Sequence, residues 1–68
     1  MKEVEDVHEA NEIALNYLAK NGIVVFGYEI TSIFKRSSAW FVLIEGKTFN
    51  GVVIIKSKTG EIVTIVKL

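Results

Sequence analysis

The pattern of apolar and polar positions along the chain changes its period near residue 22. Before this point, apolar residues recur every three or four positions, as expected for one face of a helix. These positions are Val7, Ala10, Ala14, Tyr17 and Leu18. Asp6 followed by Glu9 has the spacing of a capping box, and Asn21-Gly22 is typical of a helix C-terminus. The pattern predicts an amphipathic helix over about residues 4–21.

After residue 22 the apolar residues alternate with polar ones or form short β-branched runs, which indicates strands. The predicted strands cover about residues 24–36, 39–45, 52–57 and 61–68. Short polar or glycine-containing breaks separate them, and short connections favour antiparallel neighbours. The prediction is a single α+β domain over residues 1–68, with one N-terminal helix packed on a four-stranded antiparallel meander (αββββ).

The last predicted hairpin allows the two faces of the sheet to be assigned. If Ser57 pairs with Glu61 across a three-residue turn, one wholly apolar face carries Val53, Ile55, Val63 and Ile65. We assign this face to the helix. The opposite face carries further apolar residues, namely Val52, Ile54, Ile62 and Val66, with Phe41 and Leu43 beside them. One helix covers only one face of a sheet, so we expect the second apolar set to form an interaction surface.

Two further features are candidates for a binding site. Phe49 lies in the loop between Gly46 and Gly51. It is expected either to pack over the sheet edge or to join the interaction surface, and both alternatives stay open. Lys35-Arg36 beside Trp40-Phe41 resembles the basic and aromatic surface of a single-stranded nucleic-acid binder. A hairpin tip followed by core aromatics is the preferred interpretation of this second feature.

Composition narrows the function classes. The 68 residues are 50% hydrophobic, contain no Cys and one His, and balance eight basic against eight acidic residues. Small domains usually need disulfides, a metal or oligomerisation for stability, and disulfides and thiolate zinc sites are impossible without Cys. Oligomerisation or very dense packing remains, and the high apolar fraction fits both. We expect a homodimer or a complex with another protein or peptide. The zero net charge argues against nucleic acid as a partner.

Charge is unevenly distributed along the chain. Residues 1–12 have five acidic residues against one lysine, a net charge of −4, and residues 13–68 have a net charge of +4. The acidic segment lacks the alternating ligands and turn glycine of a calcium loop. His8, in the first helical turn, has no nucleophile or base partner that the pattern identifies. We expect no enzyme activity, no metal and no cofactor.

The remaining expectations concern source and location. The acidic start has no apolar run, and the longest apolar runs are strand-sized, so we expect a cytoplasmic protein that does not contact a membrane. The absence of Gln and Cys, with many Ile, Val, Lys and Glu residues, favours a thermophilic source.

Three segments resemble a PepSY-type domain. Residues 9–18 are similar to the leading helix of that family, residues 40–44 to its aromatic-then-aliphatic strand, and residues 52–63, with Thr59-Gly60, to its closing hairpin. Lys56 stands where the family commonly has Asp. The resemblance implies the same helix-and-meander fold and a peptide-binding or protease-modulating role. It also implies a groove along a free strand edge, with Phe49 or Trp40 nearby.

The function predicted first is a non-catalytic interaction module that self-associates, or binds a protein, through the second apolar face or a strand edge. The PepSY-like peptide-binding domain is the first alternative. The second is a weak single-stranded nucleic-acid binder that uses Lys35 and Arg36.

Overall fold

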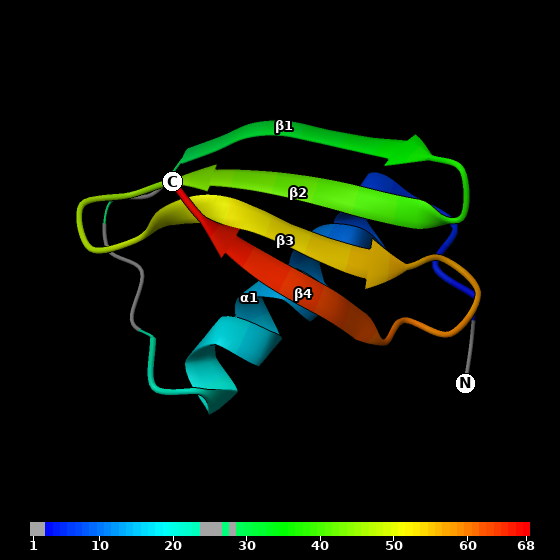
Figure 1. Cartoon of the computed structure of the whole chain (residues 1–68), viewed down its shortest axis with the longest axis horizontal. Coiled ribbons are helices and arrows are strands. Elements are labelled where there is room, and N and C mark those ends of the chain that lie inside the picture. The colour runs from blue at the N-terminus through cyan, green and yellow to red at the C-terminus, as the bar shows by residue number, and fades with distance from the viewer. Residues whose placement is uncertain (1–2, 24–26, 28) are drawn as a thin grey trace.

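The computed structural model describes residues 3–23, 27 and 29–68, and places one helix behind one antiparallel sheet (Figure 1). The elements are α1 (Val7–Lys20), β1 (Glu29–Arg36), β2 (Ala39–Glu45), β3 (Asn50–Lys56) and β4 (Ile62–Lys67). The strand order is β1-β2-β3-β4. The predicted αββββ fold is confirmed. Residues 24–26 and 28, part of the predicted first strand, lie outside the described residues.

The N-terminus of α1 is set by its cap. Asp6 has extended backbone angles, and its Oδ1 accepts a hydrogen bond of 2.9 Å from the backbone N–H of Glu9. This bond satisfies one of the N–H groups that the first helical turn leaves without a partner. The Asp6 N-cap that the spacing predicts is therefore present, and Glu9 Oε1 accepts a hydrogen bond of 3.3 Å from the backbone N–H of Glu5. The cap begins the helix at Val7, three residues later than the predicted start.

The residues before the cap form an extended segment that closes one end of the core. Val4 is 1% exposed, and its N–H donates to the carbonyl of Ser57 at 2.6 Å. The indole Nε1 of Trp40 donates to the carbonyl of Val4 at 3.0 Å. Both polar groups of the Val4 backbone thus have partners, as buried backbone groups require.

The C-terminus of α1 ends in a Schellman motif. Gly22 has a φ of 75°, which favours glycine. Its N–H donates to Ala19 at 3.1 Å, and the N–H of Ile23 donates to Leu18 at 2.9 Å. These are the two bonds of the motif. Ile23 then packs against the core, so the Asn21-Gly22 signal both ends the helix and directs the chain back towards the sheet.

The core lies between α1 and the sheet. Three residues at four-residue spacing, Ala10, Ala14 and Leu18, are fully buried on the helix. The sheet contributes Trp40, Val42, Ile44, Val53 and Ile55, and the remaining core members are Val4 and Phe49. The two alanines let the helix backbone approach the strands closely. α1 contacts β1, β2 and β3, so one helix covers the centre of one sheet face.

Candidate functional site

The sheet has two unlike faces. We call the side packed against α1 the helix face and the opposite side the open face. Along β2 and β3, every second residue is buried on the helix face, and the residues between them are only partly buried. Figure 1 shows α1 behind the sheet, and no described helix or loop lies across the face towards the viewer.

Strand pairing arranges the centre of the open face in two rows. The aromatic row runs across the four strands through Phe34, Phe41, Ile54 and Thr64. The aliphatic row beside it runs through Ser32, Leu43, Val52 and Val66. Phe34 is 38% exposed and Val66 45%, and the other apolar members are partly buried. Six apolar side chains therefore form one continuous surface, the kind of patch that marks an interaction site.

A ring stack strengthens the aromatic row. Phe34 and Phe41 lie opposite each other on β1 and β2, with ring centroids 5.2 Å apart and planes 8° from parallel. Arg36 lies above the Phe34 ring, with its Cζ 5.9 Å from the centroid, within cation–π range. The stack fixes two large rings on the open face without covering them.

Charged residues border the apolar rows at both strand ends. Glu29 and Glu45 are directly paired at one end of the sheet, which we call the acidic end. Arg36 and Lys56 flank Ala39 in the last row at the other end, the basic end. All four charged side chains are exposed. Paired residues share a face, so both ends belong to the open face.

The two outer strands are poorly suited to edge-on pairing. β1 has a register shift between Ile30 and Ser32, and β4 has one opposite Ile54 and Ile55, where Val63 is the extra residue. Such bulges twist a strand edge and interrupt its hydrogen-bonding row, a common protection of edge strands. The open face is consequently the stronger candidate for association.

The structure corrects one predicted member of this surface. Ile62 pairs with Ile55 and packs against the core, so it lies on the helix face. Val63, predicted to face the helix, is 52% exposed. Ser57 does not pair with Glu61 as predicted; the N–H of Lys56 donates to Glu61 at 2.8 Å instead.

The physical reason for this shift lies at Ser57. Its N–H donates to Ser38 at 2.8 Å, and its carbonyl accepts the N–H of Val4. The Ser57 backbone is therefore unavailable to β4, and the turn closes one residue earlier. The bulge at Val63 then restores the predicted facing of Thr64, Ile65 and Val66. The other five predicted strand members, Phe41, Leu43, Val52, Ile54 and Val66, lie on the open face as expected.

Phe49 belongs to the core and not to an exposed surface. It is 5% exposed, so of its two alternatives the structure shows packing over the sheet. Its ring lies over Gly51, where a Cβ would come within 2.8 Å of Phe49 Cζ and 2.6 Å of the Val66 carbonyl. The glycine makes the space that the aromatic ring fills.

The proposed basic patch is divided between the two faces. Lys35 pairs with Trp40, a helix-face residue, whereas Arg36 lies on the open face with Phe34. Trp40 is 7% exposed and hydrogen-bonded to Val4, so its ring is not available for stacking on a base. Phe34 is the aromatic residue of the site that the sequence interpretation missed. Its pairing with Phe41 follows from a two-residue turn at Ser37-Ser38.

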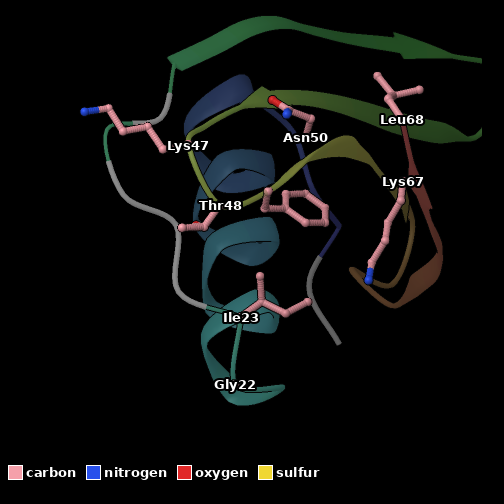
Figure 2. A pocket seen from close by; sticks show the side chains of 8 residues that line it. Gly22, Ile23, Lys47, Thr48, Asn50, Lys67 and Leu68 are labelled. Carbon is pink, nitrogen blue, oxygen red and sulfur yellow. The ribbon is translucent and has the colours of Figure 1, made fainter.

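An open hollow of about 500 Å³ lies at the acidic end of the sheet, on the side of α1 (Figure 2). Its lining includes Ile23, Thr48 and Asn50, with the two lysines Lys47 and Lys67. Figure 2 shows the Lys47 side chain directed away from Lys67. The two ammonium groups do not converge on one ligand position, so the hollow has no assembled binding site.

Groups with catalytic or metal-binding potential are sparse. Among residues 3–23, 27 and 29–68, no three His, Cys, Asp or Glu side chains gather closely enough to hold a metal ion. His8 is exposed on the first turn of α1. In the part of the chain that the structure describes, no helix is long and apolar enough to cross a bilayer.

A comparison of the chain with protein-family models, curated proteins and solved structures finds no match. The resemblance to PepSY-type domains therefore stays a prediction.

Proposed function

We propose that this chain is a non-catalytic interaction module that self-associates through the open face of its sheet. The observation that carries the proposal is the set of six apolar side chains in the two central rows, on a face that no described element covers. Burying this surface against a second protein surface removes apolar area from water, the main favourable term in protein association.

The choice of the face over a strand edge is supported by the bulges on β1 and β4. An added strand needs a regular row of free N–H and C=O groups, which a bulge interrupts. Phe49 and Trp40, the aromatic residues expected beside a peptide groove, are both buried. These facts favour face-to-face association over the peptide-binding alternative.

The nucleic-acid alternative has one supporting feature, the exposed Phe34 ring with Arg36 above it. Two glutamates on the same face, Glu29 and Glu45, would repel a phosphate backbone. The neutral net charge also supplies little of the electrostatic attraction that such binding uses. A second copy carries both acidic and basic residues on the same face, so self-association offers a partner for charges of either sign.

The size of the face sets the expected affinity. Four strands at about 4.8 Å spacing, with about 20 Å between the charged ends, give roughly 400 Å² of flat area per copy. Two copies bury roughly 800 Å² in such an interface, which is at the weak end for specific complexes. We expect dissociation constants between micromolar and millimolar, so association has to be measured at high protein concentration.

The test is sedimentation equilibrium of the wild-type chain and two matched variants, Val66→Glu and Val7→Glu. Val66 on the open face is 45% exposed, and Val7 on α1 is 43% exposed, so the same change is made at similar exposure. We expect a wild-type dimer that weakens at least about tenfold in Val66→Glu, because an unpaired carboxylate would be buried in the interface.

Val7→Glu is expected to leave dimerisation unchanged, and circular dichroism should show both variants folded. A wild-type chain that sediments as a monomer at millimolar concentration would contradict the proposed function. Equal weakening by both variants would also contradict it, because the effect would then not depend on the open face.

A further inference from the structure

We infer that the occupant of the open face is a second copy in one orientation, with its strands reversed so that the acidic end of each copy meets the basic end of the other. This inference rests on the proposed function and adds the geometry of the dimer. It is carried by the positions of four charged residues, Glu29, Glu45, Arg36 and Lys56, around the apolar rows.

When the strands of the two sheets are kept aligned, two symmetric ways exist to stack identical faces. A two-fold axis in the interface that runs along the strands places like ends together, Glu45 of one copy near Glu45 of the other. An axis that runs across the strands reverses them and places Glu45 near Arg36 and Lys56. Both arrangements are closed and use one patch on each copy, so charge is the term that separates them.

Like charges lie side by side at the acidic end of a single copy, where Lys47 lines the same small hollow as both glutamates. Glu29 and Glu45 are directly opposite each other on neighbouring strands, and like charges at this spacing repel. At the other end Arg36 and Lys56 are separated only by Ala39. The reversed arrangement supplies cations to the glutamates at both ends. The alternative arrangement would gather four glutamates at one end of the dimer.

The two ends act independently of each other. Glu45 lies six positions after Ala39 at the other end of β2, which corresponds to about 20 Å. This exceeds the Debye length of about 8 Å at physiological ionic strength. Within one copy the ends therefore attract each other little, and their charges remain available to a partner that lies directly against the face.

Side-chain size agrees with the reversed arrangement. Turning one copy about an axis across the strands places its aromatic row against the aliphatic row of the other. Phe34 then faces Ser32 of the second copy, and Phe41 faces Leu43. Large side chains opposite small ones allow two layers to interdigitate, and aligned sheets pack in this way with a modest crossing angle.

The test uses charge reversal at each end, in Glu45→Lys and Lys56→Glu, measured by sedimentation equilibrium. Each single variant places like charges together at both ends of a reversed dimer, so we expect each to weaken dimerisation about tenfold at low salt. The double variant exchanges the charges of residues 45 and 56 only, while Glu29 and Arg36 keep theirs, so it should dimerise more tightly than either single variant. An equimolar mixture of the two single variants should form a heterodimer more readily than either forms a homodimer.

Lys20→Glu is the matched control, because Lys20 is an exposed lysine in the last turn of α1, on the other side of the sheet from the open face. It should leave the dimer unchanged. Single reversals that leave dimerisation unchanged or strengthen it would overturn the reversed orientation, since in same-end stacking Glu45→Lys replaces two of the four gathered glutamates by lysines and relieves their repulsion. In that case Val66→Glu would still weaken the dimer, and the proposed function would stand. A wild-type chain that stays monomeric would instead contradict both the reversed orientation and the proposed function.

Discussion

β3 shows the difference between the two faces of the sheet within a single strand. Val53 and Ile55 are fully buried against α1, whereas their neighbours Val52 and Ile54, of the same residue types, remain partly exposed. The helix face is completed within the chain by α1, the Val4 segment and Phe49. The open face also carries apolar strand residues, and no described element covers it. Apolar character alone therefore does not distinguish a core position from an exposed one; the position of the helix does.

The largest effect is expected when an isoleucine of β3 is replaced by alanine on each face of the sheet. Ile55→Ala leaves a cavity in the core and should lower the free energy of unfolding by about 2–5 kcal/mol. Ile54→Ala removes the same atoms from the open face and should cost about 1 kcal/mol. Urea unfolding followed by circular dichroism measures both. Equal losses would mean that the two faces contribute equally to the fold.

A smaller effect is expected when one methyl group is added on each face. Gly51→Ala places a Cβ about 2.6 Å from the Val66 carbonyl, so the fold has to shift, and we expect a loss of about 1–3 kcal/mol. Val52→Ile, at the next residue on the open face, should change stability by less than about 0.5 kcal/mol. Thermal unfolding of the two variants compares them. A neutral Gly51→Ala would show that Phe49 and β4 have room to move.

The smallest effect is expected at the N-cap of α1, the helix that covers only one face of the sheet. Asp6→Ala removes the hydrogen bond to Glu9 and should lower stability by about 0.5–2 kcal/mol, as for other N-caps. The open face is unaltered, so the dimer dissociation constant of the folded protein should not change. Thermal unfolding gives the first quantity and sedimentation the second. A weaker dimer in this variant would show that α1 also contributes to association.

Most of the fold follows from local signals in the chain. The Asn21-Gly22 signal places the C-terminus of α1, whereas the helix begins at the Asp6 cap, three residues after the predicted start. Alternation gives the bounds of β2 without error. These elements are predictable because capping and side-chain alternation depend on residues close in sequence. Five of the six strand residues proposed for the interaction surface could be assigned to the correct face of the sheet for the same reason, since the direction of side chains within a strand follows from its period of two.

The errors came from contacts between distant residues. The facing of Ile62 and Val63 depends on Ser57, whose backbone is bonded to Ser38 and Val4. The interrupted register of β1 likewise has no local sign in the chain. The burial of Phe49 depends on Gly51 and on the carbonyl of Val66 from another strand.

One helix, an antiparallel meander and more apolar strand positions than one helix can cover follow from the amino-acid sequence alone, because periodicity and capping are local properties. Which apolar residues stay exposed depends on tertiary contacts, since a single bulge or turn moves a residue from one face to the other. It also gathered Glu29 with Glu45, and Arg36 with Lys56, at opposite ends of the open face. That charge pattern arises from strand pairing between segments far apart in the chain.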